Sequence, residues 1–240
     1  MELDKKGNYP KPSGAAKIAK LFCASAVKEA EKIYRNDGDP DVKKIFSLAN
    51  AEAGRYNDKT GRVAGKLNFS DFDLFAATGA LAMIKNNMVY WATICDSSIL
   101  RFDQNGHLVF RSPNDWDNLR KNLPENWVSI PPADRKKIIR KKYRNGMDKN
   151  DHPIGYGVIT GEKNAEKYLN IGKFPAVSGD VIFIITDGFE NHIGLENFVK
   201  LFLDWPKNLK SKFKKTTRDQ AVANSDKFGH ERTLIAVKII

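Results

Sequence analysis

The sequence predicts a protein of the α+β class with antiparallel sheets, and three observations carry that prediction. Short apolar segments flank tight turns, as 88–95 follows Asn86-Asn87 and 107–111 follows Gln104-Asn105-Gly106. Turns of this kind join antiparallel neighbours. Helix-like segments precede and follow these strands but do not alternate with them, as β-α-β units would require.

Two helices are predicted ahead of the first strand. Ser13 is a plausible N-cap, and apolar residues then recur at helical spacing to about Tyr34. The polar segment 36–40 contains glycine and proline and ends this helix. A second helix is expected over about 41–56, followed by a loop over 57–70.

The rest of the chain is predicted as strands, a long insertion and further helices. One hairpin pairs 72–84 with 88–95, and a second pairs 98–103 with 107–111. Neither a linker nor an internal repeat is visible, so 1–240 is expected to be a single domain. The remaining elements are a basic helical insertion at about 112–155, a short helix at 161–169, strands at 173–177 and 181–186, helices at 194–203 and 207–222, and a last strand at 233–240.

Composition narrows the class of protein. The 240 residues are 41% hydrophobic and carry a formal net charge of +11, from 40 Lys+Arg and 29 Asp+Glu. This basic balance favours anionic partners such as phosphoproteins, nucleic acids or membrane surfaces. No apolar run approaches a membrane span, and no signal peptide is visible. Cys23 and Cys95 are interpreted as free thiols in a reducing cytoplasm.

A carboxylate stands at the end of each of two strongly apolar strands. Asp187 follows the run 181–185, which is typical of a strand buried on both faces, and Asp96 ends the strand 88–95. Rigid backbone at the rim of a core holds oxygen ligands where a hard divalent cation binds. Gly188 allows a sharp turn. The competing interpretation is a simple turn at Asp187 and a hairpin-end cap at Asp96.

Taken in order, four segments resemble the metal-dependent type 2C (PPM-type) Ser/Thr protein phosphatases. The strand containing Thr78, the turn and the strand ending Asp96-Ser97-Ser98 resemble a hairpin of the family in which a Gly/Cys-Thr-containing strand is followed by one ending Gly-Asp-Ser. The segment 178–189 resembles its Gly-Asp, apolar strand, Thr-Asp-Gly motif. The segment 231–235 resembles the closing strand, and 13–19 resembles the start of a family helix.

The resemblance implies a β-sandwich flanked by helices, with two or more Mn²⁺ or Mg²⁺ ions at one end. It implies hydrolysis of phosphomonoesters by metal-activated water, on a phosphorylated protein substrate. Asp187 would be the shared metal ligand, and Asp96 would bind a neighbouring ion or orient water. Both are the candidate catalytic residues. Glu231, or its neighbour His230, falls at the position of the closing acidic ligand.

The chain departs from the family pattern in two places. Cys95 stands where glycine is usual, and the family's first two strands, which bear an arginine and acidic ligands, have no match. Asp4 is the only candidate for the second acidic centre. Two hypotheses remain: the sequence begins downstream of those strands, or the protein is a reduced relative. In the second case, it would be an inactive phosphatase-like domain that binds a phosphoprotein or regulates a partner.

Basic stretches at 135–144 and 207–215 are interpreted as solvated helix faces or as a docking surface for a phosphorylated substrate. Arg144 is the candidate for contacting substrate phosphate if the insertion folds over the site. Nucleic-acid binding is not favoured, because each stretch holds a single aromatic residue and no reader motif. His192, just past the Asp187 turn, is expected to be a solvated loop histidine.

Overall fold

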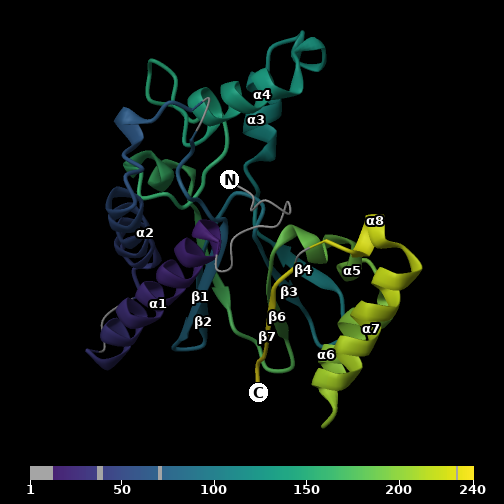
Figure 1. Ribbon diagram of the computed structural model, residues 1–240. Coiled ribbons are helices and arrows are strands. Elements are labelled where there is room, and N and C mark those ends of the chain that lie inside the picture. Colours follow the sequence, from purple (N-terminus) through teal and green to yellow (C-terminus); the bar gives the residue numbers. More distant parts are fainter. Residues whose placement is uncertain (1–12, 37–39, 70–71, 231) are drawn as a thin grey trace.

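Two antiparallel sheets pack face to face at the centre of the fold. The computed structural model describes residues 13–36, 40–69, 72–230 and 232–240. The strand order is β1-β2-β5 in the first sheet and β4-β3-β6-β7 in the second (Figure 1). The predicted α+β class with antiparallel sheets is confirmed. The strands are Gly79–Lys85 (β1), Met88–Ile94 (β2), Ser98–Phe102 (β3), Leu108–Arg111 (β4), Asn170–Pro175 (β5), Val181–Ile185 (β6) and Leu234–Lys238 (β7).

The chain crosses between the sheets at opposite ends of the sandwich. Residues 95–97 lead from β2 in the first sheet to β3 in the second, and 176–180 lead from β5 to β6. The strands predicted on either side of Ser178-Gly179-Asp180 therefore exist but belong to different sheets. β5 pairs with β2, whereas β6 pairs with β3 and β7.

Both predicted hairpins form, although the first strand starts later than expected. Asn86 and Asn87 adopt φ values of 51° and 57°, the left-handed conformation that a two-residue hairpin turn requires. β1 begins at Gly79, because the preceding backbone finds other partners. Phe75 exchanges hydrogen bonds with the Asn57 side chain, its N–H donating to Oδ1 at 2.9 Å and its carbonyl accepting from Nδ2 at 2.9 Å.

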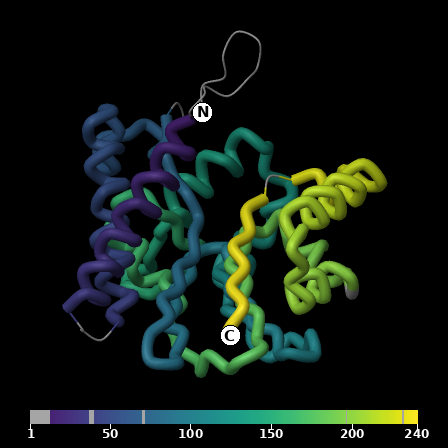
Figure 2. The backbone as a smooth tube through the Cα atoms, turned by 90° about the horizontal axis from the view of Figure 1, so that it is seen from below, coloured from purple at the N-terminus to yellow at the C-terminus, as the bar shows by residue number. Residues whose placement is uncertain are grey.

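Large apolar side chains fill the space between the sheets, with Val89, Trp91, Ile99, Phe174 and Ile182 buried there. Helices cover the two outer faces, which gives four layers. Viewed from below, α1 and α2 lie on one side of the strands and the C-terminal helices on the other (Figure 2).

Helix α1 (Gly14–Arg35) and helix α2 (Val42–Lys59) cover the first sheet and confirm both predicted N-terminal helices. The Ser13 hydroxyl accepts from the Ala16 N–H at 3.1 Å, and the Asp41 carboxylate accepts from the Lys44 N–H at 2.9 Å. The rings of Phe22 and Phe46 meet edge to face, with centroids 5.0 Å apart.

The second sheet is covered by helices that follow β6. Phe183 of β6 packs against Phe198 and Phe202, with ring centroids 6.2 and 4.8 Å away. The predicted helices at 194–203 and 207–222 are thus present with small shifts of their ends. These helices are α5 (Glu190–Ile193), α6 (Glu196–Asp204), α7 (Leu209–Ala223) and α8 (Ser225–Phe228).

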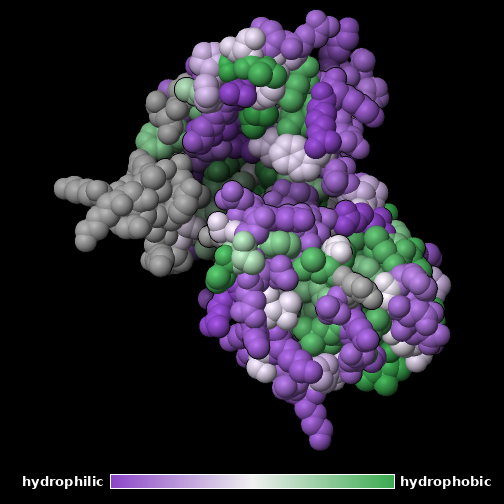
Figure 3. Space-filling model, turned by 90° about the vertical axis from the view of Figure 1, so that its right-hand side faces the viewer, coloured by the Kyte–Doolittle hydropathy of each residue, from purple (hydrophilic) through white to green (hydrophobic). Residues whose placement is uncertain are grey.

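The insertion at 112–155 forms an arm at one end of the sandwich (Figure 1). It contains α3 (Trp116–Asn122) and α4 (Pro132–Ile138), which continues as a π-helical turn at Ile139–Tyr143. The buried Tyr143 hydroxyl donates to the Asn122 carbonyl at 2.7 Å and ties the two parts together. In Figure 3 a hollow separates the upper part of the molecule, where the arm lies, from the part below it.

Short 3₁₀ helices occupy Ala64–Lys66, Trp127–Ser129, Lys163–Tyr168 and Asp187–Phe189, the third where a helix is predicted at 161–169. Within the described ranges, no helix combines the length and apolar character needed to cross a membrane.

Candidate active site

Asp96 and Asp187 lie at the same end of the sandwich, each just beyond a strand end. β3 and β6 are antiparallel, and Ser98 pairs with Ile185 in their register. Asp96 precedes Ser98 by two residues, and Asp187 follows Ile185 by two. The two carboxylates are close enough for the negative charge of Asp187 to raise the pKa of Asp96. The structure therefore brings these two predicted ligands together.

The turn that carries Asp96 is held by an unusual backbone conformation. Cys95 has a φ of 67°, in the left-handed region that favours glycine. This explains why glycine is usual at this position in the family that the sequence resembles. The Cys95 side chain is buried, and burial raises the pKa of its thiol well above the ordinary range. The thiol is therefore protonated at neutral pH and is a poor metal ligand.

A third carboxylate, Asp115, anchors this turn from the arm. Its Oδ2 accepts hydrogen bonds from the backbone N–H groups of Cys95 at 3.0 Å and Gly157 at 3.2 Å. Its Oδ1 accepts from Asn170 Nδ2 at 3.2 Å. Only 4% of Asp115 is exposed, and burial raises its pKa. The sequence analysis did not single out this residue.

The electrostatics of Asp96 fit a hard divalent cation. Burial is the largest influence raising its pKa, and the charge of Asp187 adds to it, while hydrogen bonding with Thr78 acts in the opposite direction. The Ser97 hydroxyl donates to Thr78 Oγ1 at 3.2 Å and supports that side chain. Two carboxylates that are held near each other repel, and a cation that prefers oxygen ligands relieves this repulsion when it binds between them.

Asp187 faces solvent and is available to a ligand. Its Oδ1 accepts from the Gly188 N–H at 2.8 Å, which fixes the carboxylate at the head of a 3₁₀ turn. Thr186 ties the turn to the last strand, because its hydroxyl accepts from the Thr233 N–H at 2.9 Å. The predicted ligands Asp4 and Glu231 lie outside the described residues. Within the residues described, no group of three or more His, Cys, Asp or Glu side chains is placed to hold a metal ion.

We expect Asp96→Asn to stabilise the metal-free protein while weakening cation binding. The amide cannot ionise, so the substitution removes both the cost of a partly buried charge and the repulsion from Asp187. The expected gain is about 0.5–2 kcal/mol of unfolding free energy, as is typical when functional strain is relieved. Thermal unfolding in EDTA and in excess Mn²⁺ measures both effects. A lower melting temperature in EDTA would contradict this expectation.

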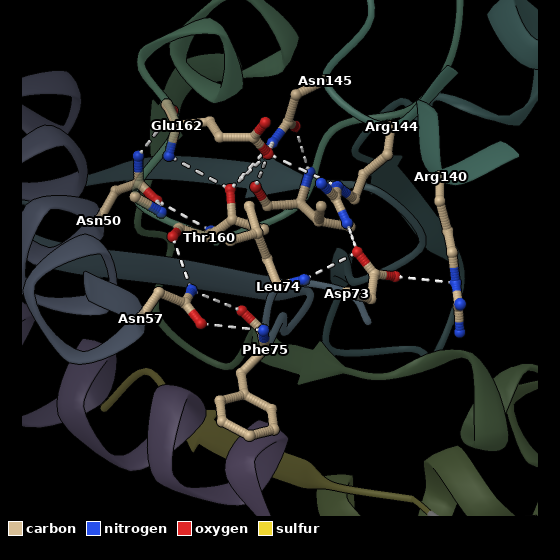
Figure 4. A network of polar contacts seen from close by, with 12 residues as sticks. Asn50, Asn57, Asp73, Leu74, Phe75, Arg140, Arg144, Asn145, Thr160 and Glu162 are labelled. Atoms are coloured by element: carbon tan, nitrogen blue, oxygen red, sulfur yellow. Dashed lines mark hydrogen bonds and ion pairs between the residues drawn. The ribbon is translucent and has the colours of Figure 1, made fainter. Parts of the chain in front are cut away.

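Arg144 lies in a buried polar network between the arm and the body (Figure 4). Its side chain is only 3% exposed and forms ion pairs with Asp73 and, at 3.5 Å, with Glu162. Arg140 binds the other oxygen of Asp73 at 3.0 Å. This geometry does not favour the predicted contact with substrate phosphate, because both carboxylates already engage the guanidinium. Its role here is to fasten the arm.

Asn145 extends this network through contacts with three other residues. The residue is 3% exposed and has a left-handed φ of 48°. Its Nδ2 lies 3.1, 3.1 and 2.9 Å from the Val158 carbonyl, Thr160 Oγ1 and Glu162 Oε2, which share its two N–H groups, and its Oδ1 accepts from the Val158 N–H at 2.8 Å. Every hydrogen-bonding group of the amide is thus used.

His192 is fully buried, so the expectation of a solvated loop histidine is wrong. Its ring lies 5.2, 5.5 and 4.9 Å from the rings of Phe189, Phe198 and Phe228, and among the described residues neither ring nitrogen has a well-formed hydrogen bond. Burial lowers the pKa of His192, and the positive charge of Arg232 lowers it further. The imidazole is therefore neutral at pH 7.

This burial predicts a loss of stability in mild acid. The unfolded chain takes up a proton near the ordinary histidine pKa of about 6.5, whereas the folded state does so only at lower pH. Unfolding free energy should fall as the pH drops below about 6.5 and level off below the folded-state pKa of His192. Urea unfolding between pH 7.5 and 5 should show a smaller fall in His192→Leu. The exposed His152→Leu is the matched control, and an unchanged pH profile in His192→Leu would contradict the assignment.

Structural comparison identifies the fold. The chain is similar to the serine/threonine phosphatase PstP/Ppp of Mycobacterium tuberculosis, with a TM-score of 0.55 and 12% identity over 94% of this chain and 83% of that one. A PstP catalytic domain in complex with two manganese ions gives 0.54 and 13%, over 92% and 78%. The S. agalactiae serine/threonine phosphatase gives 0.50 and 16%, over 93% and 83%. No protein-family model and no curated protein matches. The chain has the type 2C phosphatase fold, as its motifs predict.

Proposed function

We propose that this protein is a metal-dependent phosphatase acting on phosphorylated serine or threonine residues of proteins. The observation that carries the proposal is the pairing of Asp96 and Asp187 at an accessible end of a sandwich with this fold. The two carboxylates come from different strand ends, are mutually repulsive and have the chemistry of Mn²⁺ or Mg²⁺ ligands.

Each residue of the site has a proposed part in this activity. Asp187 and Asp96 would hold the cations, with Asp4 and Glu231 as proposed further ligands. Bound Mn²⁺ or Mg²⁺ supplies an activated water and neutralises charge on the phosphate. Asp115 positions Asp96 by binding the backbone of its turn, and the hydroxyl pair Thr78–Ser97 orients the Asp96 carboxylate.

A phosphorylated protein is the substrate class that the charge distribution supports. The arm carries exposed lysines at 136, 137, 141 and 142 and extends from the end of the sandwich at which the carboxylates lie. Such a surface attracts an anionic chain at a distance. Cys23 and Cys95 are both free thiols, and we place the protein in a reducing cytoplasm.

Release of phosphate from p-nitrophenyl phosphate and from phosphoserine and phosphothreonine peptides tests this function. We expect turnover with Mn²⁺ or Mg²⁺ and none in EDTA. The proposed phosphatase activity would be refuted if no divalent cation supported turnover by a protein that includes any residues encoded upstream. Binding of phosphopeptides without turnover would instead support an inactive phosphatase-like regulator.

A further inference from the structure

A groove of about 810 Å³ runs beside the outer face of the second sheet, between the β3–β4 hairpin and helices α5 and α6. Its apolar lining comes from both sides. Phe102 and Leu108 belong to the sheet, and Val199 and Leu203 belong to α6. Leu108 is 46% exposed, although it is a large apolar residue. Phe102 and Val199 are only 3% and 6% exposed, so the accessible apolar surface of the groove is centred on Leu108.

One end of the groove lies near the candidate active site. Glu190 lines the groove and is the third residue after Asp187. Its Oε1 accepts from the hydroxyl of Ser98, two residues after Asp96, at 3.5 Å, and its Oε2 pairs with Arg111 at 2.7 Å. Glu190 therefore connects the groove to the end of the sandwich that carries Asp96 and Asp187, although neither carboxylate lines the groove itself.

The other end is closed by the tip of the hairpin. Gly106 has a φ of 87°, and a Cβ atom built on it would lie 3.1 Å from Cδ1 of Leu203. The hairpin tip thus rests against α6, and the groove ends there. Gln104 and Asn105 line this end together with Asp204.

The geometry sets a length for the ligand. From Ser98 to Phe102 the strand rises about 13 Å at ~3.3 Å per residue, and an extended peptide alongside would cover that distance in roughly four residues. We propose that the groove binds an extended segment of the substrate protein and takes an apolar side chain about four to six residues from the phosphorylated residue. This proposal rests on the proposed phosphatase function.

The apolar floor and the link through Glu190 to the end of the sandwich that carries Asp96 and Asp187 favour this occupant. A segment of the substrate that passes Glu190 after leaving the phosphorylated residue would enter the groove. The ion pair of Arg111 with Glu190 neutralises the entrance, and Lys200 and Asp204 offset each other along the wall. Selectivity therefore comes from the apolar side chain, with the charged arm providing long-range attraction.

The test uses dodecapeptides of glycine, serine and alanine that contain one phosphoserine. Each peptide carries a single leucine, placed three to seven residues before the phosphoserine in one series and three to seven residues after it in another. The peptides with leucine at the favoured distance should have kcat/KM at least about 10-fold above the leucine-free peptide, the gain expected from burying one such side chain. Leu108→Glu should remove that gain and leave hydrolysis of p-nitrophenyl phosphate unchanged. Val109→Glu is the matched control, because Val109 is 51% exposed, adjacent in sequence and not part of the groove lining.

Equal kcat/KM for all peptides, or equal losses in the two variants, would overturn the proposal while the enzyme remains active. Dissociation of a dimer by Leu108→Glu in sedimentation, with unchanged peptide kinetics, would assign the groove to self-association and overturn it too. If the wild type does not hydrolyse p-nitrophenyl phosphate, the proposed function fails separately. Fluorescence anisotropy of the labelled peptides then decides: leucine-dependent binding lost in Leu108→Glu supports the groove, and no such binding rejects it.

Discussion

Asp187→Asn is expected to lower Mn²⁺-dependent turnover of p-nitrophenyl phosphate by at least about 100-fold, beyond the loss typical of residues that only support a metal ligand. The amide keeps the shape of the side chain but removes the negative charge that would hold the cation. The exposed position of Asp187 predicts little change in unfolding free energy. Turnover across a Mn²⁺ titration and thermal unfolding of the same sample separate these two effects.

The matched control is Asp219→Asn, the same substitution at a carboxylate that is 53% exposed on α7. It should leave both measurements unchanged. Turnover within a few-fold of the wild type in Asp187→Asn would remove this residue from the proposed site. Loss of activity together with a large fall in melting temperature would show that the effect is structural.

Asp115→Ala is expected to cause the largest loss of stability among the site residues, about 2–4 kcal/mol. The substitution leaves the Cys95 and Gly157 N–H groups and the Asn170 amide without their shared acceptor in a buried position. For a chain of this size the melting temperature should fall by roughly 5–15 °C. Activity should fall as well, because the turn that carries Asp96 loses its anchor.

Asp117→Ala is the comparison for this variant. Asp117 lies two residues further along the arm, and its side chain is 75% exposed. Its removal should cost less than about 1 kcal/mol. Equal unfolding midpoints for the two variants in urea would disprove the anchoring role of Asp115.

Local signals made much of this fold predictable. Ser13 and Asp41 are N-caps in the structure because their short polar side chains accept from the first turn of a helix. Asn86-Asn87 form the hairpin turn because asparagine tolerates positive φ. The position of Asp187 after an apolar strand also followed from sequence, since a buried strand must end at the rim of the core.

Other features depend on contacts between distant residues. Asp115 resembles an ordinary N-cap before α3, yet its side chain bonds to residues 20, 42 and 55 positions away. Arg144 belongs to a basic run that is typical of an exposed helix face, and its burial follows only from the placement of Asp73 and Glu162. The sequence alone does not distinguish a hairpin turn from a crossing between sheets, as 176–180 illustrates.

The crossing at 95–97 has a consequence for the order of folding. Asp96 lies within this crossing, two residues after the end of β2 in the first sheet and two before the start of β3 in the second. Pairing of β3 with β6 alone brings Asp96 and Asp187 to the same end of the second sheet. The burial of Asp96 and its hydrogen bond with Thr78, which precedes β1, also need the first sheet in place. A compact intermediate with native strands and loose packing would therefore bind Mn²⁺ more weakly than the native protein. Cation affinity would thus report the docking of the two sheets.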